Sequence, residues 1–162
     1  MNRLRKAAAW YARLPAVAAW AVSLAALFVG ILLLGLLQGP GVSPNVQSLK
    51  SDWSQAPWRL VAAVLIMPIL ETLVFQALFL GGFARLTRAR WPWIFVSALA
   101  FSLGLHYQAG WFPMLVAGWG GLVFSATYLG LRDRSFARAF AVTSCVQVTF
   151  AIIGVAGAIL VG

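Results

Sequence analysis

Long apolar runs alternate with short basic clusters along this chain. Five runs stand out, over residues 15–37, 58–86, 91–108, 111–131 and 135–161. A transmembrane helix needs about 20 residues to cross a hydrocarbon core of about 30 Å, and each run approaches or exceeds that length. We therefore predict an all-α fold, a polytopic membrane bundle of five transmembrane helices that forms a single domain over residues 1–162.

The basic residues predict how these helices cross the membrane. Ten of the 12 Lys and Arg residues precede the first run, or lie at and between the adjoining ends of the second and third runs and of the fourth and fifth. The opposite side holds only Lys50 and Arg59. Because basic residues are retained in cytoplasmic loops, we predict a cytoplasmic amino terminus and an external carboxy terminus.

Composition supports a membrane location and excludes a nucleic-acid partner. The 162 residues are 62% hydrophobic and 9% charged, with a mean hydropathy of +0.91, whereas soluble domains carry about 25% charged residues. The net charge of +9 would suggest nucleic acid in a soluble protein, but here the bases sit between apolar runs, where they set topology and contact anionic lipid. The Trp-, Arg- and Ala-rich composition is compatible with the cytoplasmic membrane of a GC-rich bacterium.

One acid lies inside an apolar run. Asp52 and Asp133 fall in predicted loops, but Glu71 sits in the middle of the second run. A carboxylate at bilayer depth costs a few kcal/mol and persists only where it faces the bundle interior and has a partner or a task. Glu71 is therefore either a protonated side chain hydrogen-bonded to a neighbouring helix or a functional group.

The single histidine offers Glu71 a catalytic partner. His106 lies near the outer end of the third run, where a lone His is more often a structural or interfacial residue. A carboxylate and an imidazole that share one water form a workable general base. One Glu and one His fall short of the three protein ligands of a catalytic zinc site, so we expect no metal and no other cofactor.

Further polar side chains lie at membrane depth. Gln76 follows Glu71 by five residues, and Thr143 and Gln147 are one turn apart on the fifth run, so they share a helix face. They could donate to a carboxylate or to a substrate carbonyl, or serve as polar contacts between helices. Cys145 lies about 100° or more away from both on the helix, and we expect it to be a buried small hydrophobe.

These residues resemble the motifs of a known family. The second run reads Pro68-Ile-Leu-Glu71-Thr72-Leu-Val-Phe75-Gln76, which is similar to the first motif of the CPBP family, the CAAX-protease and bacteriocin-processing (Abi) membrane proteins. That motif is commonly Glu-Glu-x-x-x-Arg. The segment from Phe101 to His106 is similar to the second motif, an aromatic residue shortly before a His. The resemblance covers about residues 58–151.

The chain departs from the family pattern at four positions. Thr72 stands for the second Glu and Gln76 for the Arg, while Thr143 and Gln147 stand for the His and Asn of the third motif. The resemblance implies that Glu71 is the general base and His106 its partner. It also implies that Gln147 or Thr143 is an oxyanion donor and that Gln76 orients Glu71. The absence of the Arg and of the second His removes positive charge that would stabilise the charged groups of the reaction.

The resemblance implies a glutamic-type intramembrane endopeptidase, a peptide hydrolase that cleaves the membrane-embedded or carboxy-terminal segment of another protein within the bilayer. The alternative is a non-catalytic relative, an immunity or partner-binding protein that keeps the fold. A proton-coupled carrier with Glu71 as its titrating group is disfavoured, because no internal repeat accompanies the five runs. The oligomeric state and the substrate stay open.

Overall fold

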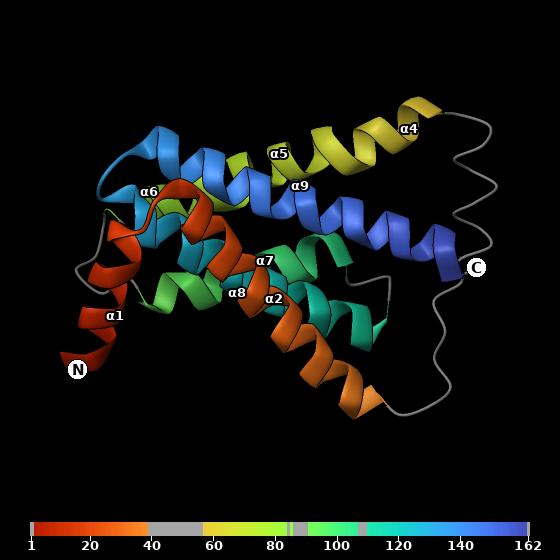
Figure 1. The fold of residues 1–162 in the computed structure, drawn as a ribbon, viewed down its shortest axis with the longest axis horizontal. Helices are drawn as coiled ribbons and strands as arrows, with labels where there is room; N and C mark the ends of the chain where they lie inside the picture. The colour runs from red at the N-terminus through yellow and green to blue at the C-terminus, as the bar shows by residue number, and fades with distance from the viewer. Residues whose placement is uncertain (1, 39–56, 84, 86–90, 107–109, 162) are drawn as a thin grey trace.

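The computed structural model describes residues 2–38, 57–83, 85, 91–106 and 110–161, and all the regular structure within these ranges is helical. This confirms the predicted all-α class. Four helical segments, 16–36, 58–83, 111–132 and 136–157, are long and apolar enough to cross a membrane, and a shorter apolar helix covers 91–104. The chain is thus a polytopic helical membrane protein. In Figure 1 α9 runs beside the segment from α4 to α6, and α2 crosses the bundle at an angle.

The elements follow the chain as α1 (Asn2–Arg13), α2 (Ala16–Gln38), α4 (Pro57–Val61), η1 (Ala62–Ile66), α5 (Met67–Glu71), η2 (Thr72–Leu80), α6 (Gly81–Phe83), α7 (Trp91–His106), α8 (Trp111–Arg132) and α9 (Phe136–Val161). The pieces from α4 to α6 are contiguous and form one span, here called the second span. The predicted ends of the second and third spans, residues 86 and 108, lie outside the described residues, in the ranges 86–90 and 107–109.

Helix α8 is the centre of the bundle. Of its most apolar 18-residue window 56% is buried, against 22–33% in the other spanning segments, and it packs against α1, α2, α7, α9 and η2. Close approach depends on small residues. A Cβ on Gly121 would lie 2.9 Å from the Cα of Ala98 on α7. The indole of Trp119 covers Gly30 of α2 and donates to the carbonyl of Ala26 at 3.2 Å.

The second span changes its helical register around Pro68. Proline has no N–H and clashes with the preceding turn of an α-helix. Just before it, η1 is a π-helix, in which the N–H of Met67 reaches the carbonyl of Ala62 five residues back. A second, longer π-helix, η2, begins directly after Glu71. The wide turns of π-helices are rare and occur frequently at functional sites, and here they flank the one acid within the spans.

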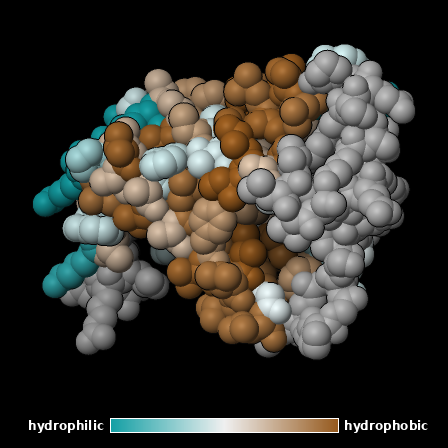
Figure 2. All heavy atoms as spheres, turned by 45° about the vertical axis from the view of Figure 1, so that its right-hand side comes forward, coloured by the Kyte–Doolittle hydropathy of each residue, from teal (hydrophilic) through white to brown (hydrophobic). Residues whose placement is uncertain are grey.

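The two ends of the bundle differ in charge. Helix α1, the start of α7 and the turn between α8 and α9 lie together at one end, called the basic end, and the end of α9 lies at the other (Figure 1). Lys6, Arg13 and Arg134 are exposed at the basic end. Figure 2 shows hydrophilic atoms gathered at this end and hydrophobic atoms over the middle of the visible face, as expected of a surface that lies in lipid. The cytoplasmic location of this end stays a prediction.

Helix α1 was not anticipated from the apolar runs. It is held against the bundle by Tyr11, whose hydroxyl donates to the carbonyl of Ala19 at 3.1 Å and pairs with the Ser23 hydroxyl at 2.6 Å. The guanidinium of Arg138 donates to the carbonyl of Leu14, which ties the start of α9 to the turn between α1 and α2. The bundle is therefore closed at its basic end by a short helix that precedes the first span.

Candidate active site

Glu71 ends α5 at the middle of the second span. It follows the start of α4 at Pro57 by 14 residues and precedes the end of α6 at Phe83 by 12, which corresponds to about 20 Å of helix on either side. The side chain is partly buried. Its neighbours Leu70 and Leu73 are exposed, whereas Thr72 is fully buried. Glu71 therefore stands at the boundary between the outer surface of the span and its packed interior.

Thr72 joins the second span to α9. Its hydroxyl donates to the side-chain oxygen of Gln147 at 2.8 Å, and the same oxygen atom lies 2.9 Å from the carbonyl of Pro68 one turn back. A hydroxyl carries one proton and two lone pairs, so Thr72 donates to one of these two acceptors at a time. When it donates to Gln147, the amide is held with its nitrogen facing away from Thr72.

Four polar side chains form a buried group between these helices, here called the amide layer: Thr72, Gln76, Thr143 and Gln147. All four are 0–3% exposed. Neither amide atom of Gln76 has a hydrogen-bond partner among the residues that the structure describes, and the same holds for the Thr143 hydroxyl and the Gln147 nitrogen. An unsatisfied buried polar group costs about 1–3 kcal/mol, which makes the amide layer the candidate site of this chain.

Serine side chains hold η2 against α7 and α8. The Ser97 hydroxyl donates to the carbonyl of Phe75 at 3.0 Å, and the Ser125 hydroxyl donates to Ser97 at 3.2 Å. Phe75 directly precedes Gln76, so this chain of hydrogen bonds fixes the wide turn that carries the buried amide. Ser97 and Ser125 were missed from the sequence. The available signal was their polarity in runs that are otherwise apolar.

The end of α7 lies beside Phe75. The rings of Phe75 and Phe101 pack edge to face with centroids 5.4 Å apart, and a Cβ on Gly104 would lie 3.8 Å from the Phe75 ring. The second span and α7 run in opposite directions (Figure 1). Along α7, His106 lies two residues, or about 3 Å, beyond Gly104. Along the second span, Glu71 lies four residues, or about 6 Å, from Phe75 in the same direction.

The backbone of His106 is therefore at a depth within about one helical turn of Glu71. Its side chain lies outside the part of the chain that the structure describes, so the pairing of its ring with the Glu71 carboxylate stays a prediction. Across the described side chains no group of three or more His, Cys, Asp and Glu could hold a metal ion. The expectation that no metal takes part likewise stays a prediction.

Cys145 corrects one expectation from the sequence. It was expected to be buried, but it is exposed. Cys145 is two residues from both Thr143 and Gln147, so it lies on nearly the opposite face of the helix, and on this helix that face points out of the bundle. A thiol on the outer surface of a span takes no part in the buried site.

A comparison with family models identifies the chain. The model described as type II CAAX prenyl endopeptidase Rce1-like matches residues 53–149. This range contains Glu71, His106 and all of the amide layer. The chain belongs to the Rce1-like family. The match begins five residues before the predicted core of 58–151 and ends two residues earlier, and it confirms the resemblance to the CPBP proteins, to which the Rce1-like family belongs.

No curated protein and no solved structure matches the chain. Membership in the Rce1-like family places the chain among CAAX-type intramembrane proteases, which act on membrane proteins or peptides within the lipid bilayer. The matched range omits α1 and α2. These two helices pack against the matched part of the chain, α1 on α8 and α2 on both α8 and α9.

Proposed function

We propose that the chain is an intramembrane endopeptidase of glutamic type, in which Glu71 is the general base and His106 its partner. The observation that carries this proposal is the hydrogen bond of 2.8 Å from Thr72 to Gln147. It brings the span that carries the only acid at membrane depth against the helix that carries the third motif. Membership in a family of intramembrane proteases supports the same reading.

The reaction divides between the carboxylate and the amide layer. A water held between Glu71 and His106 attacks the peptide carbonyl, and its proton passes to the carboxylate. The carbonyl oxygen becomes an oxyanion, which the free Gln147 nitrogen or the Thr143 hydroxyl stabilises by donation. When the tetrahedral intermediate collapses, the C–N bond breaks and the proton from Glu71 passes to the departing amine.

Neutral groups take the place of charged ones in this scheme. Gln76 stands where the family pattern has an Arg, but neither of its amide atoms bonds to Glu71 in the structure; Thr72, which stands for the second Glu, orients Gln147. An uncharged donor stabilises an oxyanion less than a cation does, so we expect a slow enzyme. The substrate is the membrane-embedded or carboxy-terminal segment of another protein, and the setting is a bacterial cytoplasmic membrane.

The test is cleavage of a membrane-anchored reporter in vesicles that contain the purified full chain. Glu71→Gln and His106→Ala should each abolish cleavage. Asp133→Asn is the matched control, because it makes the same acid-to-amide change at an exposed turn residue, and it should cleave at the normal rate. Cleavage that survives both site changes contradicts the assigned roles.

A non-catalytic, partner-binding relative is the second candidate, and the lack of charge in the amide layer favours it. Under this alternative Glu71→Gln leaves function intact. Bulky residues at Gly118 or Gly121 would not separate the two candidates, because a Cβ on Gly121 would press on the Ala98 backbone and one on Gly118 would contact Ser102, both within the chain itself.

A further inference from the structure

A cavity lies at the basic end, away from the candidate active site. Its volume is about 630 Å³, within the range of about 300–1,000 Å³ typical of small-molecule sites. Residues of α1, α2, α7 and α8, together with Asp133 in the turn after α8, line it, and none comes from the second span or from α9. The proposed peptide hydrolysis therefore leaves this cavity without a role.

The walls of the cavity are apolar and lined by small residues. Five are alanines, whose short side chains leave the space open: Ala7, Ala9, Ala12, Ala26 and Ala126. The hydroxyls that reach it from Tyr11, Ser23 and Thr127 bond to one another or to backbone carbonyls at 2.6–3.1 Å. With these hydroxyls already paired, the cavity offers an occupant a largely apolar surface, and the other polar groups of its lining are the indoles of Trp10 and Trp91 and the carboxylate of Asp133.

The depth of the cavity matches one leaflet of a bilayer. On α2 the lining reaches Ala26, ten residues from the start of the helix, and on α8 it runs from Asp133 back to Val123. Both distances correspond to about 15 Å of helix, which is half of a hydrocarbon core of about 30 Å. An acyl chain that enters from the surface of one leaflet would end near the midplane.

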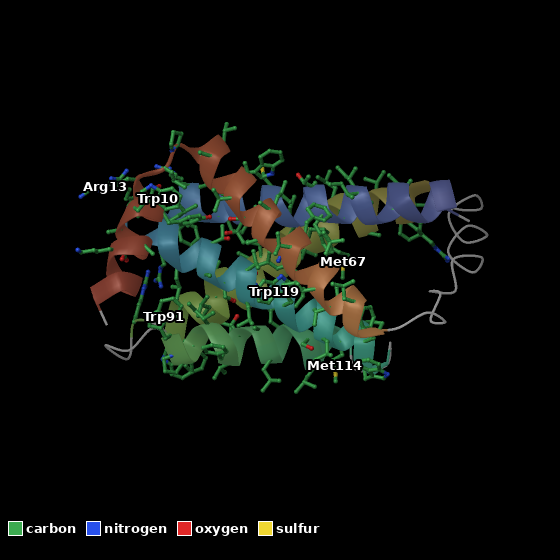
Figure 3. The ribbon with its side chains drawn as sticks, turned by 60° about the horizontal axis from the view of Figure 1, so that its bottom comes forward. Trp10, Arg13, Met67, Trp91, Met114 and Trp119 are labelled. Carbon is green, nitrogen blue, oxygen red and sulfur yellow. The ribbon has the colours of Figure 1, made fainter. Side chains whose placement is uncertain are left out.

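The rim carries the charge that a phospholipid headgroup needs. Lys6, Trp10 and Arg13 follow one another at intervals of four and three residues on α1, so they share one helix face. Trp10 lines the cavity and is 57% exposed, and both basic side chains are exposed. Figure 3 shows Trp10 and Arg13 on α1 at the same end of the bundle as Trp91, which lines the cavity from α7.

We infer that this cavity binds one anionic phospholipid, with an acyl chain between α1, α2 and α8 and the phosphate against Lys6 and Arg13. Trp10 and Trp91 then lie at headgroup level, where indole rings are favoured. The lipid would fasten α1 to the bundle, in addition to the hydrogen bonds of Tyr11. This site is independent of the proposed protease activity.

Native mass spectrometry of the full chain, titrated with phosphatidylglycerol and with neutral phosphatidylcholine, tests the inference. We expect one tightly bound phosphatidylglycerol and weaker phosphatidylcholine. Arg13→Gln should weaken the anionic lipid about fivefold, since a basic side chain near a membrane surface contributes ~1 kcal/mol. Arg59→Gln, the same change at the other end of the bundle, should have no effect.

A second test fills the cavity with a large side chain. Ala26→Trp should abolish binding of both lipids, whereas Ala25→Trp, an exposed neighbour that does not line the cavity, should keep it. Ala126→Trp makes the same block from α8 if the first variant does not fold. Equal affinity for the two lipids, or binding that survives both blocked variants, overturns the inference. The inference is also overturned if an uncharged lipidated peptide binds in the cavity as tightly as phosphatidylglycerol and its binding is unaffected by Arg13→Gln. That result would assign the cavity to a substrate.

Discussion

The hydroxyl of Thr72 lies 2.8 Å from the side-chain oxygen of Gln147, and this contact crosses from the second span to α9. Thr72 occupies the position where the family pattern has a second Glu, and Gln147 the position where the third motif has an Asn. Because the carbonyl side of the amide takes the Thr72 proton, the nitrogen side is left to face the amide layer. One neutral hydrogen bond thus determines which end of Gln147 is available for chemistry.

Thr72→Val should lower kcat about fivefold and leave KM unchanged. Valine keeps the shape of threonine but removes the donor, and one net hydrogen bond is worth ~1 kcal/mol. Thr72→Ser keeps the hydroxyl and should restore the rate. The measurement is the cleavage rate in vesicles. Thr127→Val serves as the control, since it removes a buried hydroxyl that bonds to Ser23 on the other side of the bundle. An equal loss of rate in this control would contradict a specific role for Thr72.

Gln147→Leu should lower kcat by about 10²–10³, the usual effect of removing an oxyanion donor. Leucine has a similar volume, so the helix packing of this buried position is retained. The thermal unfolding temperature in detergent should stay close to that of the unchanged chain. If the rate falls only in proportion to the amount of folded protein, Gln147 acts as a contact between helices and not as a donor.

Much of the candidate site could be predicted from the sequence, because polar residues are rare in membrane-spanning segments and therefore stand out. Glu71 was identifiable as an acid within an apolar run, and the spacing of Thr143 and Gln147 placed them on one face. The structure buries Thr143 and Gln147, as it does Thr72 and Gln76, and joins Gln147 to Thr72 by a hydrogen bond. In a soluble protein the same residue types would have been lost among many polar positions.

Other features could not be derived from an assumed regular α-helix. The π-helical turns of η1 and η2 alter which residues of the second span face inward, and the hydrogen bond from Ser97 to the Phe75 carbonyl depends on where that backbone lies. Helix α1 was missed because it is too polar to register as an apolar run. Its one informative pattern was the spacing of Lys6, Trp10 and Arg13.

Gln76→Leu should raise stability while it lowers activity. Both amide atoms of Gln76 are buried and have no partner within the described part of the chain, so leucine removes a penalty of about 1–3 kcal/mol. The same change removes an unpaired amide of the amide layer that could donate a hydrogen bond to the substrate carbonyl, and kcat should fall. Unfolding in detergent and cleavage in vesicles, measured on one preparation, check both signs. A variant that loses stability would indicate that Gln76 has structural partners.

Gly121→Val should prevent the bundle from assembling. A Cβ at this position would lie 2.9 Å from the Cα of Ala98 and 3.2 Å from its carbonyl oxygen. These are backbone atoms of a packed helix, so neither can move aside without shifting α7, and overpacking of this kind costs about 1–3 kcal/mol or more.

Because α7 carries His106 and packs its Phe101 ring on Phe75, the displacement should also separate the two predicted catalytic helices. Gly154→Val is the matched control, since a Cβ there meets nothing within 4 Å. Size-exclusion chromatography of the purified variants should give a monodisperse peak for the control and aggregate for Gly121→Val. A folded Gly121→Val variant that still cleaves would show that α7 and α8 tolerate a wider separation than this contact allows.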